Sequence, residues 1–232
     1  MRPPTARGCA AATLAIGALA SVLFWPRPLS DDPLAIDQVP SDGSWSGTVS
    51  PPPGQEGWFR LVRTQLSSRI PALAEHDRAR LAMAILEEAE AAGLDPLFVL
   101  AVIEVESAFD PAARSIRGAL GLMQLRPSTL RSELRRARLS DGDVSDPVVN
   151  VRGGVRYYRR LLRIFKTQDA ALMAYNAGPK RISGYLRKGH VPERFREYPR
   201  RVRAEVKRLR RGLSLANPPA VAEAVSGPVR VE

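Results

Sequence analysis

The sequence predicts an all-α fold with a single helical domain. Between residues 57 and 212, apolar side chains recur at helical spacing in one segment after another, as on the buried face of a helix. We find no convincing alternation of apolar and polar residues that would indicate strands, and no internal repeat. With 232 residues and 44% hydrophobic content, the chain can bury one sizeable core but hardly two.

The expected helices are bounded by residues that commonly begin or end helices. Gly93 ends one helix, and Asp95 can cap the next, with Pro96 at its first position. Asp146 is a second cap of this kind, and Gly178–Pro179 forms a turn between two helices. The expected helices are Trp58–Ile70, Glu75–Ala92, Pro96–Ala108, Pro127–Arg138, Pro147–Phe165, Gln168–Asn176, Pro179–Lys188 and Glu193–Arg211.

Residues 1–25 are predicted to form a signal peptide or an uncleaved membrane anchor. Arg2 and Arg7 precede an apolar run over residues 8–25, a pattern typical of export signals. Cleavage after Ala20 would remove the segment, whereas the full run is just long enough to span a bilayer with the N-terminus in the cytoplasm. Either alternative exports the remainder to the periplasm or cell envelope, and the second anchors it in the inner membrane.

Two other segments have the composition of extended chain. Residues 26–56 contain seven prolines, mixed with serine, glycine and aspartate, and are expected to form a disordered linker. Residues 213–232 are similar and are predicted to form a disordered tail. The helical domain is therefore expected over residues 57–212, between these two segments.

The chain is strongly basic. Lys and Arg outnumber Asp and Glu by 35 to 24, which gives a net charge of +11. Such a balance favours polyanionic partners, namely anionic lipid headgroups, acidic wall polymers or nucleic acid. Nucleic acid is disfavoured by the export signal and by the lack of stacking aromatics among the late arginines. We expect those arginines to hold the protein near an anionic wall or membrane. The basic residues concentrate at Arg131, Arg135, Arg136, Arg138, Arg152, Arg156, Arg159, Arg160, Arg163, Arg200, Arg201, Arg203, Lys207, Arg208, Arg210 and Arg211.

No metal and no cofactor are expected. The only cysteine is Cys9, so an internal disulfide is impossible, and we expect it to be an inert apolar residue. The only histidines, His76 and His190, have no neighbours at metal-ligand spacing. Neither a structural nor a catalytic zinc site is therefore predicted.

Two carboxylates interrupt an apolar segment. Glu104 and Glu106 lie within Leu97–Phe109, which is predicted to be a buried helix. A carboxylic acid in an apolar helix either pairs with a cation, for example an arginine, or keeps its proton near neutral pH. A carboxylic acid that is protonated at pH 7 is what a glycosidase needs as its general acid. A helix points residues two apart in directions about 200° apart, so at most one of these glutamates faces a cleft.

Several blocks of residues occur in a recognisable order. Glu106–Ser107 is followed by Ser115, then by Gly118-Ala119-x-Gly121-Leu122-Met123-Gln124, and later by Ala174–Pro179. These blocks resemble the catalytic domain of the soluble lytic transglycosylases (the SLT domain), which has a lysozyme-like fold. The resemblance covers residues 75–190. Enzymes of this family cleave the glycan strands of bacterial peptidoglycan.

The resemblance implies one catalytic residue. The family's catalytic glutamate is directly followed by serine, so the matching residue is Glu106, and Glu104 is expected to pair with a nearby arginine. Glu106 would act first as acid and then as base. The bond between N-acetylmuramic acid and N-acetylglucosamine would break without water, leaving a 1,6-anhydro end.

Two alternatives remain open. A lysozyme-type muramidase would hydrolyse the same bond, and it usually needs a second carboxylate. A basic wall-binding or nucleic-acid-binding protein would lack catalysis altogether. Each aspartate that could supply this second carboxylate can also be explained by a structural role in the fold. These candidates are Asp110, Asp141, Asp143, Asp146 and Asp169.

The resemblance also implies the residues that contact substrate. Ser115 matches a serine thought to contact the N-acetyl group, although it could equally be a turn hydroxyl. Tyr175 matches a tyrosine that reaches the catalytic carboxylate. The amide of Gln124 needs partners, which sugar hydroxyls or Glu106 would supply. Gly121 would let the backbone turn tightly and approach the sugar. The full set of implied substrate-binding residues is Ser107, Ser115, Gly121, Met123, Gln124, Tyr175, Asn176 and Tyr198.

The chain departs from the family pattern near its end. Many relatives carry Glu-Thr-Arg-x-Tyr-Val, whereas this chain has Arg194–Pro199 in the corresponding place. Arg196 and Tyr198 match the pattern, so Tyr198 is a candidate cleft residue. Asn150 also matches a family position, and we expect it to be structural.

Overall fold

The computed structural model describes residues 49–51, 53–139, 143 and 145–216. The predicted signal peptide or anchor over residues 1–25 lies outside the described residues, as do Cys9, linker residues 26–48 and tail residues 217–232. Among the helices that the structure describes, none combines the length and the apolar character needed to cross a bilayer.

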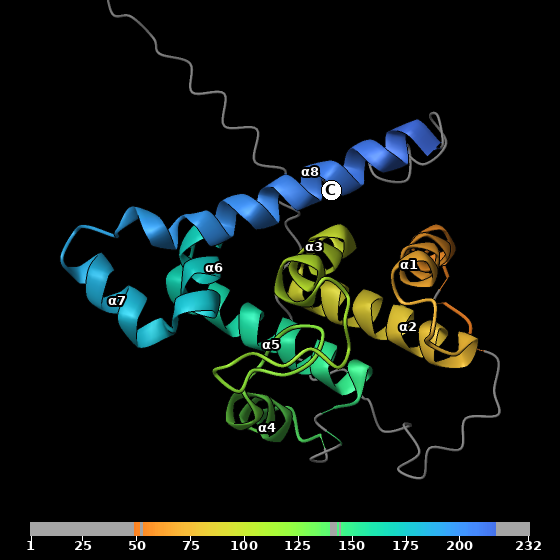
Figure 1. The fold of residues 1–232 in the computed structure, drawn as a ribbon, viewed down its shortest axis with the longest axis horizontal. Helices are drawn as coiled ribbons and strands as arrows, with labels where there is room; N and C mark the ends of the chain where they lie inside the picture. Colours follow the sequence, from red (N-terminus) through yellow and green to blue (C-terminus); the bar gives the residue numbers. More distant parts are fainter. Residues whose placement is uncertain (1–48, 52, 140–142, 144, 217–232) are drawn as a thin grey trace, which may run out of the picture.

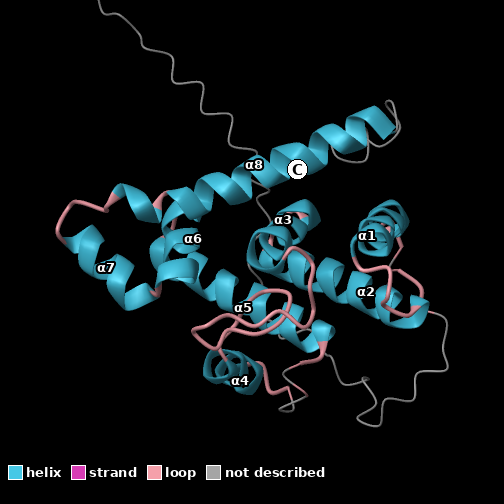
Figure 2. Cartoon of the chain, viewed as in Figure 1, coloured by secondary structure: helices cyan, strands magenta, loops and turns pink. Residues whose placement is uncertain are grey.

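The described part of the chain is helical, which confirms the predicted all-α fold (Figure 1; Figure 2). Within it, β structure is limited to isolated bridges that join Arg114 to Leu120 and Leu120 to Leu125. The elements are α1 (Glu56–Arg69), α2 (Glu75–Ala92), α3 (Pro96–Ser107), α4 (Pro127–Arg136), α5 (Pro147–Phe165), α6 (Gln168–Ala177), α7 (Pro179–Arg187), the 3-10 helix η1 (Glu193–Phe195) and α8 (Glu197–Ala216).

The helices begin and end close to the predicted residues because the predicted caps form. The carboxylate of Asp95 accepts a hydrogen bond from the backbone N–H of Leu97 at 2.8 Å. Asp146 does the same for Val148 at 2.7 Å. Gly93 ends α2 in the left-handed conformation, with a φ of 64°. The last segment differs from the prediction, because η1 precedes α8 and α8 continues past Arg211 to Ala216.

Helix α3 lies at the centre of the fold. Figure 1 shows α8 crossing over α3 and α6, with the loop between α3 and α4 lying over α5. Helix α3 packs against α2 and α8, and α5 packs against α2, α4 and α6. Every residue from Leu97 to Ile103 is buried. The unbroken apolar run of α3 is therefore explained by neighbours on all its sides.

Helix α5 uses its arginines to hold the helices on either side of it. Arg156 on α5 donates to both carboxylate oxygens of Glu88 on α2, at 2.9 and 2.8 Å. Arg160 on α5 donates twice to Glu133 on α4, at 2.9 and 2.7 Å. Both carboxylates are only 4% exposed, and a buried charge requires such a partner. Part of the basic cluster seen in the sequence is therefore used inside the fold.

Two adjacent glycines let other segments approach α5 closely. A Cβ atom on Gly153 would lie 2.1 Å from a methyl carbon of Leu130, and one on Gly154 would lie 2.3 Å from the sulfur of Met123. Because Met123 belongs to the loop that follows α3, this contact fixes the loop against α5.

We expect the substitution Gly154→Ala to destabilise the protein by about 2 kcal/mol, because the added methyl group overlaps Met123 in a packed core. Urea unfolding measures the change. Gly184→Ala on α7 is the matched control, since a Cβ there meets no atom within 4 Å. It should be neutral or stabilise the helix by about 0.5–1 kcal/mol. Equal effects of the two substitutions would contradict the role assigned to Gly154.

Candidate active site

Glu106 lies in the last turn of α3. The helix stops there because Ala108 and Phe109 both adopt positive φ angles, 51° and 63°. The side chain of Glu106 is only partly exposed. The hydroxyl of Tyr198, near the start of α8, donates a hydrogen bond to Oε1 of Glu106 at 2.5 Å. Since Tyr198 is itself only 6% exposed, the carboxyl group is held by a buried donor.

The environment raises the pKa of the Glu106 carboxyl from 4.5 to about 7. Burial is the main cause, because an ionised carboxylate loses its hydration there. The hydrogen bond from Tyr198 and the positive charge of Arg201 act in the opposite direction and lower the pKa. The result is a carboxyl group that can give and take a proton near neutral pH.

The tyrosine that contacts Glu106 is Tyr198, whereas the sequence analysis expected Tyr175 to reach it. The hydroxyl of Tyr175 instead donates to the backbone carbonyl of Met123 at 2.8 Å. Burial, together with the charge of Glu106, raises the pKa of both tyrosines well above 10. Both hydroxyls therefore stay protonated and act as donors.

The loop after α3 is held together mainly by its own polar groups. The amide of Gln124 donates to the carbonyl oxygens of Ala113 at 3.1 Å and Gly121 at 2.9 Å. Ser115 accepts from the backbone N–H of Ala119 at 3.0 Å. Ser107 donates to the carbonyl of Leu122 at 2.9 Å. In this structure Gln124 thus satisfies its donors on the backbone and does not bond to Glu106.

Asn150 on α5 anchors the same loop from inside. It accepts from the N–H of Met123 at 2.8 Å and donates to the carbonyl of Leu120 at 2.9 Å. It is 1% exposed, which confirms its predicted structural role. Gly121 has a φ of 72°, and a Cβ there would lie 2.7 Å from Asn150. The positive φ of Gly121 agrees with the expected tight turn, and its close approach to a sugar stays a prediction.

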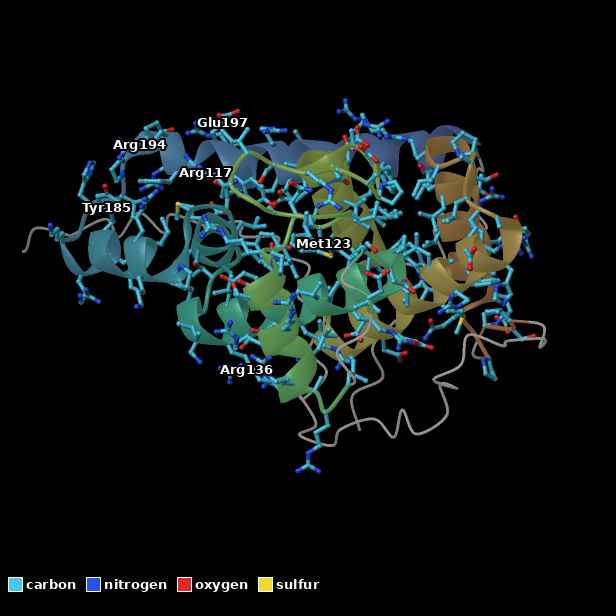
Figure 3. The ribbon with its side chains drawn as sticks, turned by 60° about the horizontal axis from the view of Figure 1, so that its bottom comes forward. Arg117, Met123, Arg136, Tyr185, Arg194 and Glu197 are labelled. Atoms are coloured by element: carbon cyan, nitrogen blue, oxygen red, sulfur yellow. The ribbon has the colours of Figure 1, made fainter. Side chains whose placement is uncertain are left out.

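Met123 and Asn176 occupy opposite environments. Met123 is 1% exposed, and Figure 3 shows it near the middle of the view, among the side chains between the ribbons. Its side chain packs in the core, so only its backbone takes part in ordering the site. Asn176, at the end of α6, is exposed. Of the residues predicted to bind substrate, Asn176 has the freest side chain.

Glu104 has the partner that the sequence analysis expected. Arg69 on α1 forms an ion pair with it, which confirms its structural interpretation. The side chains of Glu104 and Glu106 thus point from α3 toward different neighbours, as a spacing of two residues requires.

The candidate second carboxylates that the structure describes all have partners within the fold. Asp110 accepts from the N–H of Ala112 at 2.8 Å, and Asp143 accepts from Ser145. Asp146 caps α5, and Asp169 pairs with Arg203. Asp141 lies outside the described residues. Among the described residues, no carboxylate is found that shifts the pKa of Glu106.

From the sequence, Arg201 is only one member of a basic cluster. In the structure it lies beside the end of α3, where it donates to the carbonyl of Val105 at 3.4 Å and lowers the pKa of Glu106. Its position three residues after Tyr198 was a usable signal, because residues three apart share one face of a helix.

Parts of this chain are similar to a known family model and to several known proteins. Residues 83–194 match the family model described as "Transglycosylase SLT domain". A transglycosylase of Enterobacteria phage PRD1 is 38% identical over 85 residues, which cover 37% of this chain and 30% of the phage protein. An endo-type membrane-bound lytic murein transglycosylase A of Klebsiella pneumoniae is 40% identical over 86 residues, covering 34% of this chain and 42% of that protein.

Solved structures share the fold. An inactive mutant of lytic transglycosylase Slt from Pseudomonas aeruginosa superposes with a TM-score of 0.52 and 26% identity, covering 69% of this chain and 30% of that one. The 70 kDa soluble lytic transglycosylase of Escherichia coli superposes with a TM-score of 0.51 and 22% identity. The alignment covers 68% of this chain and 30% of that one. This chain spans less than half the length of each of these relatives.

We expect Tyr198→Phe to raise the pKa of Glu106 above its present value of about 7. The lost hydrogen bond stabilises the ionised form, so its removal favours the protonated form up to higher pH. Carbon-13 NMR titration of the glutamate carboxyl groups measures the shift. Tyr185→Phe is the control, because Tyr185 packs on Phe195 and makes no contact with Glu106. A pKa that falls or stays constant in Tyr198→Phe would refute the assignment.

Proposed function

We propose, from the premise that residues 83–194 form a transglycosylase SLT domain, that the protein is a peptidoglycan lytic transglycosylase. It would cleave the bond between N-acetylmuramic acid and N-acetylglucosamine without water and leave 1,6-anhydro-muramic ends. The observation that supports this most is the single Glu106 carboxyl, with a pKa of about 7 and a buried tyrosine as its partner. One such group can serve as both acid and base.

In the first step, protonated Glu106 donates its proton to the glycosidic oxygen. The bond between that oxygen and C1 of the muramic ring breaks, and positive charge develops on the ring. The N-acetyl group of the substrate can stabilise this charge, which removes the need for a second carboxylate. Glu106 is now ionised, and Tyr198 and Arg201 stabilise it in this state.

In the second step, Glu106 acts as a base. It takes the proton from the C6 hydroxyl of the muramic ring while that oxygen bonds to C1. The ring closes as a 1,6-anhydro sugar, and Glu106 recovers its proton. Because no water is consumed, no group is needed to position one.

The predicted substrate-binding residues fall into two groups according to their contacts in the structure. Ser115 and Asn176 remain candidates for direct sugar contacts. The remaining ones would form the wall that holds Glu106 and the loop in place. These are Ser107, Gly121, Met123, Gln124 and Tyr175, with Tyr198 acting on Glu106 itself.

We further propose export to the periplasm or cell envelope, with inner-membrane association through residues 8–25 where the signal is retained. The sequence of residues 1–25 and the net charge of +11 support this. On α8, Lys207 and Arg211 are exposed and form no ion pair with a carboxylate among the described residues. They are available to anionic wall polymers or lipid headgroups.

This surface role predicts strong salt dependence. The fraction of protein that sediments with purified sacculi should fall severalfold when the salt is raised from about 0.05 M to 0.5 M, because exposed charges are screened. Replacing Lys207 and Arg211 with glutamine should lower binding at low salt. Binding that is equally strong at both salt concentrations would eliminate this role for α8.

The catalytic proposal predicts a defined product. Digestion of purified peptidoglycan by the full chain should give fragments with 1,6-anhydro-muramic ends, identified by mass spectrometry. Glu106→Gln should reduce the rate at least about a thousandfold, since it removes the proposed general acid and base. Glu104→Gln is the matched control on the same helix and should remain active. Reducing muramic ends would instead show a lysozyme-type hydrolase, and no products would favour a binding role.

A further inference from the structure

The last turn of α3 is held by polar contacts, because the core does not enclose it. Every residue from Leu97 to Ile103 is buried, whereas residues 104–107 are each partly exposed. This turn carries Glu106, so the place of its carboxyl group depends on what holds the turn. The C-terminal end of a helix has unpaired carbonyl groups and a partial negative charge. Cations from other helices are therefore well suited to hold this turn in place.

Arg69, in the last turn of α1, is one such cation. Its guanidinium forms an ion pair with Glu104 on α3, and the same group lies over the ring of Phe109 at 5.3 Å. These two partners lie on either side of Glu106 in the sequence, one before it and one after it. A single side chain from α1 therefore contacts both ends of the turn that carries Glu106.

Both contacts of Arg69 are partly shielded from water. The side chains of Arg69 and Glu104 are 25% and 28% exposed, so salt and water screen their attraction less than that of a fully exposed pair. Phe109 is buried and has a positive φ of 63°, a conformation that an aromatic residue adopts only where its surroundings hold it. A guanidinium suits both partners, because its edge pairs with a carboxylate and its face stacks on a ring.

Helix α1 lies outside the residues that match the family model. The model matches residues 83–194, whereas α1 covers Glu56–Arg69. Figure 1 shows α1 and α3 both lying against α2, which brings the end of α1 within reach of the end of α3. A segment that precedes the matched residues thus contributes a contact to the helix that carries Glu106.

We propose that Arg69 is a positioning residue for Glu106. By holding Glu104 and Phe109, it keeps the last turn of α3 closed and the carboxyl group of Glu106 buried beside Tyr198. The inference rests on the proposed function, since it concerns how the same carboxyl group is kept ready to act as an acid. Arg69 itself touches no substrate and acts only through the turn that it holds.

Loss of Arg69 should lower the pKa of Glu106. Burial is the main cause of its value of about 7, so a turn that opens to water lets the pKa fall toward 4.5. The groups that interact with Glu106 are Tyr198 and Arg201 on α8 and Tyr175 on α6. None of these is a partner of Arg69 among the described residues. Since the acid form starts the reaction, the alkaline limb of the pH–rate profile should move to lower pH.

The test compares Arg69→Met with Arg63→Met in the full chain. Arg63 is a matched control on the same helix, because it also forms an ion pair, with Glu75 on α2, and also lies over a ring, that of Phe59 at 5.5 Å. In carbon-13 NMR titrations, Arg69→Met should lower the pKa of Glu106 by about one unit. The rate of peptidoglycan cleavage at pH 7 should then fall about fivefold, because the protonated fraction falls from about one half to about one tenth. Arg63→Met should change neither quantity.

Arg69→Lys is the second variant, for the case in which Arg69→Met does not fold. It keeps the ion pair with Glu104 but loses the flat group over Phe109, so it should lower the pKa of Glu106 by a smaller amount. Glu104→Gln keeps an oxygen that accepts from Arg69, which is why that variant stays active.

A pKa of Glu106 that stays near 7 in a folded variant of Arg69, or an equal shift in Arg63→Met, would overturn the inference. The titration needs no substrate, so it tests Arg69 independently of catalysis. Failure of the unmodified chain to form anhydro ends would refute the catalytic proposal separately.

Discussion

The hydrogen bond from Tyr198 to Glu106 is the contact on which the arrangement of the site depends. It joins the end of α3 to the start of α8, two elements that lie far apart in the sequence, at 2.5 Å. It also stabilises the ionised carboxyl against the burial that would otherwise raise its pKa still further. A proton donor that must later become a base needs both effects, since burial alone would keep it protonated.

The remainder of the fold serves to hold that contact in place. Helix α3 is buried from Leu97 to Ile103, so the helix that carries Glu106 cannot shift without disturbing the core. Helix α5 fixes the loop after α3 through Asn150 and Gly154, and it holds α2 and α4 through buried ion pairs. Those pairs contribute mainly to geometry, because two buried charges gain little net stability over an apolar contact. Arg160 has two roles in this arrangement, since it orients Glu133 and covers the ring of Tyr157.

The loop after α3 shows why short polar residues can resemble substrate contacts in a sequence. Gln124 and Ser107 both donate their hydrogen bonds to nearby backbone carbonyls. A segment that folds back on itself without regular strands must pair its carbonyl and N–H groups with side chains. The same residue types at the same spacing therefore fit a sugar site or a stiff loop. Here the loop forms the wall of the site and is rigid because of them.

The sequence alone predicted the helices of this protein and pointed to Glu106 as its candidate catalytic residue. Asp95, Asp146, Gly93 and Gly178–Pro179 marked helix ends, because capping depends on residues that are neighbours in the chain. The resemblance singled out Glu106, and a spacing of two on a helix already required Glu104 to face elsewhere. Only the tertiary structure showed that Tyr198, and not Tyr175, reaches Glu106, and that Arg201 lies beside it. Such contacts follow from how α8 packs across α3, and the angle and register of that packing are set by side chains from several helices at once.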